Sequence, residues 1–255
     1  MTKTPSTQRR LLMALLGAVC TTSALPLWAQ STGSNTVKLI VGYAPGGPVD
    51  SSARVFAPVL SRELGQPVIV ENRPGAGGAV AGNTVVKSAP NSLEIFYAAS
   101  PTMTISPHVL KAMAFDPLKD MTPLATILSY ANVLVINQNQ PFKTLPELVA
   151  FGKANPGKLA YGSAGMGASN HLSGELFARR AGINMTHVPY KGNAPAMTDV
   201  MGGQIQMMFD IVGGAKAHID GGKVRPLAVT SKERNPALPQ LPSMTELGIR
   251  DYDVG

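Results

Sequence analysis

Apolar and polar residues follow two different periodic patterns along this chain. Short apolar runs, typical of buried strands, are separated by stretches in which apolar residues return every three or four positions, as on one face of a helix. Val37–Val41 is the first such run. A helical pattern over about Asp50–Leu64 follows it, with Gly65 as a stop signal and Pro58 as a predicted kink or break.

The same alternation continues along the chain. Further strands are predicted at Val68–Val70, Leu93–Ala98, Val133–Ile136, Leu159–Tyr161, Thr186–Val188, Ile205–Phe209 and Leu227–Val229. Further helices are predicted at Ala79–Lys87, Leu145–Ala154 and Ser169–Arg180, with a short one that ends at Met201. Strands separated by helix-length segments indicate βαβ units and mostly parallel sheets, so the predicted fold class is α/β.

Gly-rich turns between strands and helices fall in two separated groups, near residues 42–100 and 162–213. This separation favours two lobes over one continuous sheet. Ligands of open α/β sheets bind beyond the carboxyl ends of the strands. Two lobes that face each other with these ends would therefore enclose a ligand between them.

The most informative turn joins the first strand to the first helix. Its backbone N–H groups would point into the cleft, and the dipole of the following helix favours an anion there. Asp50 is either a helix cap, which we favour, or a cleft carboxylate. The candidate ligand-binding residues of this lobe are Tyr43, Ala44, Pro45, Gly46, Gly47 and Asp50, with Ser100 at the end of the third strand.

A second candidate set lies in the other lobe. Gly165 and Gly167 let the backbone approach a ligand, Ser163 can donate or accept a hydrogen bond, and His171 falls in the first turn of the next helix. An equally good interpretation is a tight turn with no ligand. Ser163 and His171 could also form a nucleophile–base pair, so an exported α/β hydrolase-like enzyme is an alternative function.

Asp210 ends the alternating strand, and it is either a helix cap or a cleft carboxylate that takes an amine or hydroxyl group. The histidines are scattered, with no pair at helical ligand spacing, so no metal site is expected. We interpret His108, His187 and His218 as single histidines satisfied by their surroundings.

The Gly-rich loops do not fit nucleotide cofactors. Gly46-Gly47 is followed by Pro48-Val49, where a phosphate-binding loop needs Gly-Lys-Ser/Thr. Val80 and Asn170 stand where a dinucleotide-binding loop needs glycine. No cofactor is therefore expected.

The N-terminus has the features of a secretory signal peptide. Basic residues precede the apolar run Leu11–Val19, and small residues end the segment at Ala29, so residues 1–29 are predicted to be cleaved on export. Arg9-Arg10 leaves both Sec and twin-arginine export open. The only cysteine, Cys20, lies inside this segment, so the exported chain has no disulfide and no thiolate.

Composition and charge fit an exported globular protein. The 255 residues are 44% hydrophobic, with a mean hydropathy of +0.09. The formal charge of +7 falls to +4 without residues 1–29, because 19 basic residues then stand against 15 acidic ones. This mild excess suits the attraction of small anions and does not call for nucleic acid.

Several motifs occur in order along nearly the whole exported chain. They are Ala44-Pro45-Gly46-Gly47, Val70-Glu71-Asn72-Arg73-Pro74-Gly75-Ala76-Gly77-Gly78, Ala154-Asn155-Pro156-Gly157-Lys158-Leu159, Ser163-Ala164-Gly165, His187-Val188-Pro189-Tyr190-Lys191-Gly192 and Phe209-Asp210. With these motifs the chain resembles the tripartite tricarboxylate transporter receptors, the Bug-type periplasmic solute-binding proteins.

The resemblance implies a two-lobe periplasmic binding protein of type II-like fold with a hinge. Backbone amides of the first turn and ordered waters would hold a ligand carboxylate, and the Ser163–His171 region would close over the rest. The implied bounds are 30–128 for the first lobe, 129–228 for the second, and 229–255 for a segment that returns to the first lobe. The C-terminal part of the family fold is expected to be missing.

The resemblance also implies a receptor without catalysis. Its ligand would be a small carboxylate (a di- or tricarboxylate, an amino acid or an aromatic acid) that is delivered to membrane permease subunits. Ligand sensing for a membrane sensor kinase is a further alternative. We expect a periplasmic monomer with no nucleic-acid partner. Pro48 replaces the usual glycine and removes a backbone donor, and Ala168 replaces the usual threonine or serine and removes a hydroxyl.

Overall fold

The computed structural model describes residues 36–111 and 113–254, which belong to one compact unit, Thr36–Gly255. The predicted signal peptide lies outside the described residues. In the part of the chain that is described, no helix is both long and apolar enough to cross a membrane.

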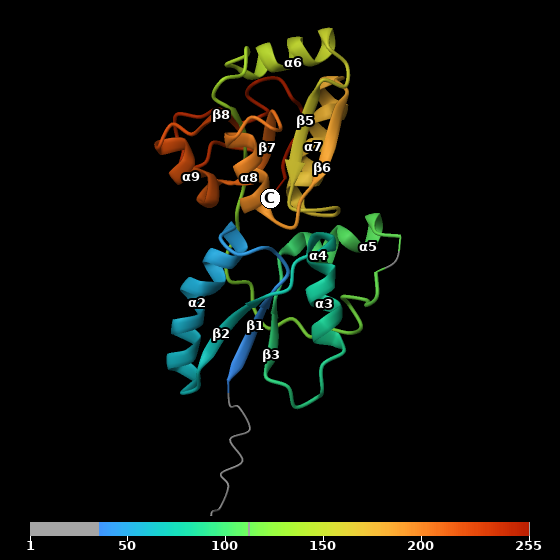
Figure 1. Cartoon of the computed structure of the whole chain (residues 1–255), viewed down its shortest axis with the longest axis vertical. Helices are drawn as coiled ribbons and strands as arrows, with labels where there is room; N and C mark the ends of the chain where they lie inside the picture. The colour runs from blue at the N-terminus through green and yellow to red at the C-terminus, as the bar shows by residue number, and fades with distance from the viewer. Residues whose placement is uncertain (1–35, 112, 255) are drawn as a thin grey trace, which may run out of the picture. The chain divides into compact units, whose positions relative to one another are not determined.

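A three-stranded parallel sheet forms first. β1 (Val37–Val41) lies between β2 (Val68–Asn72) and β3 (Glu94–Tyr97), and both neighbours run parallel to it. α2 (Pro48–Leu64) packs along β1 and β2, and α3 (Ala79–Val86) packs along β1 and β3 (Figure 1). These are the first two predicted helices, each covering the sheet as a crossover helix must.

The ends of α2 follow from its sequence. Pro48 is the first helical residue, where the missing N–H costs nothing and the fixed φ angle suits the helix. Gly65 ends the helix in the left-handed conformation, with φ of 63°. Pro58 lies inside α2 without ending it. Of the two outcomes predicted for Pro58, a kink or a break, the break does not occur.

The second sheet has five strands in the order β6-β5-β7-β4-β8. β5 pairs in parallel with β6 and β7, whereas β4 is antiparallel to both β7 and β8. The strand bounds are β4 Asn132–Asn137, β5 Leu159–Ser163, β6 Met185–Pro189, β7 Met207–Ile211 and β8 Val224–Val229. The sheets are thus mostly parallel, as predicted, with β4 as the exception.

Each face of the five-stranded sheet carries its own apolar cluster. Along β7, Phe209 joins one cluster and Met208 joins the other, because successive side chains of a strand point to opposite faces. Phe177 of α7 packs in the cluster with Phe209, and Val200 of α8 packs in the one with Met208. The covering helices are α6 (Leu145–Ala154), α7 (Ser169–Ala181), α8 (Asn193–Met201) and α9 (Val212–Asp220).

The end of the described chain differs from the expected return to the first lobe. Tyr252 and Val254 are buried in the same cluster as Phe177 and Phe209 of the five-stranded unit. The Tyr252 hydroxyl donates to the carbonyl of Ser173 at 2.6 Å. The ring of Tyr252 completes the core between α7 and the five-stranded sheet, and this packing holds the end of the described chain on that sheet.

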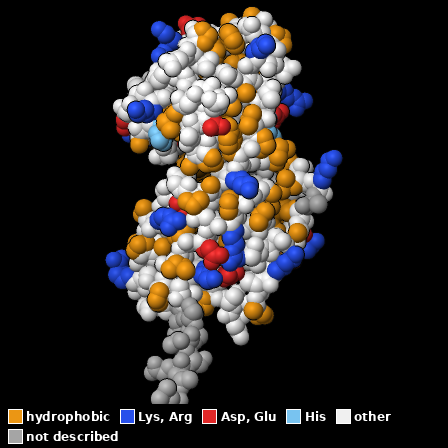
Figure 2. Space-filling model, in the orientation of Figure 1, with side chains coloured by type: hydrophobic (Ala, Val, Ile, Leu, Met, Phe, Trp, Pro, Cys, Tyr) orange, Lys and Arg blue, Asp and Glu red, His pale blue; other side chains and the backbone are white. Residues whose placement is uncertain are grey.

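Lys and Arg side chains are scattered over the face of the molecule drawn in Figure 2 and do not gather in one basic patch there. A scattered distribution on this face gives no electrostatic track for a polyanion.

Candidate functional site

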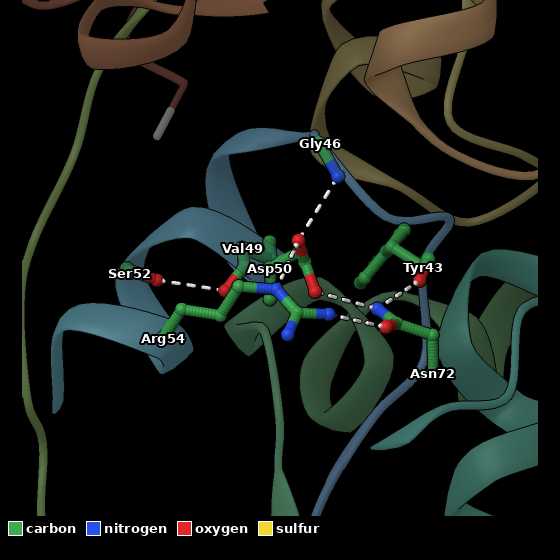
Figure 3. Close-up of polar contacts among 7 residues, drawn as sticks. All are labelled: Tyr43, Gly46, Val49, Asp50, Ser52, Arg54 and Asn72. Atoms are coloured by element: carbon green, nitrogen blue, oxygen red, sulfur yellow. Dashed lines mark hydrogen bonds and ion pairs between the residues drawn. The ribbon is translucent and has the colours of Figure 1, made fainter. Parts of the chain in front are cut away.

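The turn between β1 and α2 is organised by Asp50, which is buried in the first turn of the helix. Its Oδ2 accepts hydrogen bonds from the N–H of Gly46 and from Nε of Arg54, both at 2.9 Å. Its Oδ1 accepts from Nδ2 of Asn72 at 2.8 Å (Figure 3). Burial alone would raise the pKa of Asp50, but these hydrogen bonds outweigh it and hold the pKa below its usual value.

This network changes which backbone donors are free. The Gly46 N–H is used by Asp50, and the Ala44 N–H donates to the carbonyl of Lys191 at 2.8 Å. The first intrahelical bond of α2 runs from Ser51 N–H to the Gly47 carbonyl at 2.9 Å. The amides of Val49 and Asp50 precede that bond, so they are the N–H groups that a helix start leaves without an intrahelical acceptor.

Tyr43 uses its hydroxyl inside its own lobe. The hydroxyl donates to the carbonyl of Gly77 at 2.9 Å, and Thr102 Oγ1 donates to the same oxygen at 2.7 Å. Burial raises the pKa of Tyr43 to about 12. The hydroxyl of Tyr43 is therefore used within the protein.

The second candidate loop lies between β5 and α7. Ser163 is fully buried, and its Oγ lies 2.6 Å from Nε2 of His187 and accepts from the N–H of Gly165 at 3.1 Å. His171, in the first turn of α7, accepts from the N–H of Gly167 at Nδ1, at 3.4 Å. The structure thus brings together all four candidate residues of this loop.

The structure corrects the interpretation of His187 as a single histidine. Its ring lies 4.4 Å, centroid to centroid, from that of His171 and stacks on Tyr161 at 5.0 Å. Burial lowers the pKa of His187 to about 4, with a further decrease from His171, while Glu175 opposes it. Ser163 therefore pairs with His187, on the neighbouring strand β6, and not with His171.

Asp210 is buried inside β7 and does not cap α9, whose first residues receive no side-chain hydrogen bond. Its Oδ1 accepts from Nδ2 of Asn193 and from the N–H of Ile211, the latter at 2.8 Å. Burial raises the pKa of Asp210 to about 6 against these hydrogen bonds. The interpretation of Asp210 as a helix cap is therefore wrong.

Loops of the two sheets meet with glycines at the contact points. A Cβ on Gly77 would lie 2.3 Å from the carbonyl oxygen of Met166, and one on Gly165 would lie 3.0 Å from the Gly77 nitrogen. A Cβ on Gly214 would lie 2.4 Å from Cγ of Pro48. Because these positions lack side chains, backbone can pack on backbone where the loops close.

A small pocket lies where these loops meet, and its cavity of about 10 Å³ has room for about one water molecule. Among the described residues that line it, none is Lys, Arg or His. The lining residues are Tyr43, Val49, Ala99, Pro101, Tyr130, Ala164, Ala168, Ser169, Asn170, Asn193 and Ile211. A more open groove runs along α7 and β6, lined by residues such as Leu176 and Met185, and it contains none of the candidate residues.

Among the described residues that line the small pocket, Tyr43 is the one that the sequence pattern had named as a candidate. Asp50, Ser163 and Asp210 are buried next to the lining residues Val49, Ala164 and Ile211, and Ser100 is exposed beside the lining residues Ala99 and Pro101. The sequence pattern missed the polar lining residues Ser169, Asn170, Asn193 and Tyr130. The first three begin α7 and α8, so their position at the start of predicted helices was the available signal.

Residues 52–254 match the family model described as "Tripartite tricarboxylate transporter family receptor". A curated relative from Cupriavidus necator, "UPF0065 protein in gbd 5'region", is 36% identical over 249 residues, which are 95% of this chain and 75% of the relative.

Solved structures give the same result. The chain superposes on "R. palustris Rpa4515 with adipate" with a TM-score of 0.82 and 32% identity, covering 86% of this chain and 73% of that one. For "MatC (Rpa3494) from Rhodopseudomonas palustris with bound malate" the TM-score is 0.83 and the identity 30%, covering 86% of this chain and 75% of that one. For "Structure of periplasmic binding protein BugD" the TM-score is 0.79 and the identity 34%, covering 86% of this chain and 73% of that one.

The chain spans about three quarters of the length of these relatives. The family and the solved relatives are solute-binding receptors and not enzymes, which decides against the hydrolase alternative for Ser163. This chain belongs to the tripartite tricarboxylate transporter receptor family, as a Bug-type solute-binding protein with the periplasmic-binding-protein fold.

Proposed function

We propose that this protein binds a small organic carboxylate in the pocket between the start of α2 and the loop that joins β5 to α7. In this proposal the loaded protein delivers its ligand to the permease subunits of a tripartite tricarboxylate-type transporter. The observation that carries the proposal is the pocket itself, which brings Val49 at the α2 N-terminus face to face with Ala168–Asn170 of the second lobe.

Neutral donors supply the electrostatics of this site. The N–H groups of Val49 and Asp50 point along the dipole of a 17-residue helix, which favours an anion at its start. Across the pocket, Asn170 uses its Oδ1 to accept from the N–H of Ala164 at 3.0 Å, so its Nδ2 remains the donor. Such donors recognise a carboxylate group rather than a whole molecule.

The relatives point to a small acid. The cavity itself measures about 10 Å³, which is room for about one water molecule, so the lobes would have to open to admit even a small ligand. Two solved relatives carry adipate and malate in their descriptions. We therefore propose dicarboxylates and hydroxy- or amino-acids of similar size as the ligands to test first.

Asp210 adds a preference within this class. Both of its hydrogen bonds from described residues fall on Oδ1, so Oδ2 is the oxygen that can accept from a ligand. Asp210 does not line the closed pocket, so a hydroxyl or amine on the ligand would supply that donor only when the lining residue Asn193 moves aside as the lobes open. Malate and aspartate should consequently bind more tightly than succinate.

The test is a calorimetric titration of the protein purified from the periplasm with malate, aspartate, succinate and adipate. The neutral diamide of malate is the matched control. The proposal expects saturable heat for at least one acid, no heat for the diamide, and unchanged ligand afterwards. Steady consumption of the acid, or heats that do not depend on its carboxylates, would overturn it.

Export is part of the same proposal. Expression of the full chain followed by cell fractionation and N-terminal sequencing should find the protein in the periplasm, with Gln30 as its first residue. Recovery from the cytoplasm with Met1 intact would contradict both the proposed location and the predicted cleavage after Ala29.

A further inference from the structure

Two histidines whose rings lie in contact at a tilt of 37° are hydrogen-bonded to the loop that joins β5 to α7. His171 comes from α7 and His187 from β6, and their ring centroids are 4.4 Å apart. His171 accepts from the N–H of Gly167, and His187 is hydrogen-bonded to Ser163, which in turn accepts from the N–H of Gly165. The pair therefore holds the loop at both of its ends.

The bond to His171 exists in one protonation state only. Nδ1 can accept from the Gly167 N–H when the imidazole is neutral and carries its proton on Nε2. A protonated ring presents an N–H at Nδ1, which faces the Gly167 N–H and repels it. Protonation of His171 thus removes the attachment of Gly167.

Protonation of His187 rearranges the other attachment. In the neutral tautomer that carries its proton on Nδ1, the Ser163 hydroxyl donates to Nε2 at 2.6 Å while its oxygen accepts from Gly165. A charged ring must donate at Nε2, which forces the Ser163 proton toward the more distant carbonyl of Gly165, 3.3 Å away. Two charged rings at this separation would also repel each other.

The groups that face the pair reinforce the neutral state. Tyr161 of β5 stacks on His187 and donates its hydroxyl to Glu175 of α7 at 2.6 Å. Burial lowers the pKa of His171, and only Glu175 opposes this among the causes of the shift. Both histidines are therefore neutral at neutral pH, and they take up protons as the pH falls below their usual range.

The loop held by the pair is also the loop that closes on the first lobe. The Met166 carbonyl packs on Gly77, and Gly167 packs on Ser106 so closely that a Cβ there would lie 2.5 Å from the serine Oγ. Ala164 and Ala168 of the same loop line the pocket. Any release of the loop therefore reaches both the contact between the lobes and the pocket wall.

We propose that the pair His171–His187 positions the loop 164–168 for closure over the ligand, and that protonation of the pair releases the loop and weakens ligand binding. This inference rests on the proposed function, and it makes the two histidines positioning residues that act through Ser163, Gly165 and Gly167. A periplasmic receptor with this device would release its ligand in acid.

The first experiment needs no ligand. Amide hydrogen exchange of the segment 163–169 is measured by mass spectrometry at about pH 7.5 and about pH 3.5, below the pKa of about 4 of His187, and corrected for the intrinsic rate. Wild-type protein should lose protection of this segment in acid. His171→Gln keeps an acceptor oxygen but has no site for a proton, so its protection should change less with pH. His218→Gln, in α9, is the matched control and should behave as wild type.

The second experiment measures the affinity for malate over the same pH range. Wild-type affinity should fall with pH below the pKa values of the pair, by up to about tenfold per pH unit for each histidine whose protonation is linked to release. His171→Gln and His187→Gln should flatten this dependence. Glu175→Gln should move the fall to lower pH, because Glu175 raises the pKa of both histidines.

The two experiments separate the possible failures. If no acid binds at any pH but exchange shows the predicted pattern, the proposed ligand class is wrong and the loop device stands. If wild type and His171→Gln lose protection equally in acid, the pair does not control the loop and the inference is overturned. The same holds if Glu175→Gln leaves the midpoint of the affinity profile unmoved.

Discussion

The carboxylate of Asp50 accepts a hydrogen bond from the backbone N–H of Gly46, with 2.9 Å between nitrogen and oxygen. This bond uses one of the donors that the sequence assigned to the ligand. Asp50 therefore shapes the turn, and the free donors move one turn further, to Val49 and to the N–H of Asp50 itself.

Replacing Asp50 should destabilise the turn and weaken ligand binding together. Asp50→Asn loses the ion pair with Arg54 and leaves poorer acceptors for Gly46 and Asn72, at an expected cost of about 1 to 3 kcal/mol in the free energy of unfolding. Urea unfolding and calorimetry with malate measure the two effects.

Asp220→Asn is the matched control, since Asp220 pairs with Lys216 on the exposed face of α9 and should matter by less than about 0.5 kcal/mol. An Asp50→Asn protein with full stability but no affinity would show that this carboxylate touches the ligand directly.

Closure should be sensitive to a single methyl group on α9. A Cβ on Gly214 would lie 2.4 Å from Cγ of Pro48, across the contact between the two sheets' loops. Gly214→Ala should therefore weaken malate binding, because the bound state needs this contact closed. The adjacent Gly213 has nothing within 4 Å of an added Cβ, so Gly213→Ala should leave the affinity unchanged.

The same contact predicts compensation. Pro48→Gly removes the ring that the added methyl group would strike, so the double variant should regain much of the affinity lost in Gly214→Ala. A double-mutant cycle gives the coupling between the two positions. Strictly additive effects would mean that the two residues do not meet in the ligand-bound protein.

The stability that Asp210 contributes to the protein should be lost as the pH rises from about 4 to about 6, because its carboxyl group loses its proton in this range. Its pKa is raised from 3.8 to about 6 in the folded protein, so the folded state binds the proton more tightly than the unfolded state. The stabilisation is complete below the unfolded value and is lost as the pH rises through the folded value. The shift corresponds to roughly 3 kcal/mol at most.

Asp210→Asn isolates this effect. The histidine pair acts in the opposite direction: the lowered pKa of His187 makes stability rise with pH between about 4 and 6.5, and the lowered pKa of His171 has an effect of the same sign. The difference in unfolding free energy between wild type and Asp210→Asn cancels the histidine contribution. That difference should move in favour of the variant from pH 4 to pH 7, and a constant difference would show that Asp210 keeps an ordinary pKa.

Ser163→Ala should affect the loop more than the fold. The change removes the hydroxyl that links Gly165 to His187, which leaves a buried imidazole nitrogen and a backbone N–H without that partner. We expect a loss of about 1 to 3 kcal/mol in stability and a weaker affinity for malate. If calorimetry finds the affinity of Ser163→Ala unchanged, the loop is not part of the binding site.

The strand and helix pattern was largely predictable because each apolar run has a local period. The exceptions have physical causes. Ile205 was expected to open the strand that became β7, but its N–H closes the turn after α8 on the Asp199 carbonyl, at 3.4 Å. α9 went unpredicted because Gly213 and Gly214 disfavour a helix, and the contact with Pro48 requires the second of them to stay small.

The candidate site was predictable only in part. The sequence located both loops, because Gly-rich strand-to-helix turns are local features. It could not pair His187 with Ser163, since that contact depends on β6 lying beside β5. It also could not show that Gly46 and Ala44 use their N–H groups within the protein, which is a matter of tertiary contacts.

The most direct test of the account is a crystal structure with the tightest-binding acid of the panel. We predict a ligand carboxylate within hydrogen-bonding distance of the Val49 and Asp50 N–H groups, with the loop 164–168 closed over it. A ligand bound elsewhere, for instance in the groove along α7 and β6, or an anion held only by lysine or arginine side chains, would contradict the account.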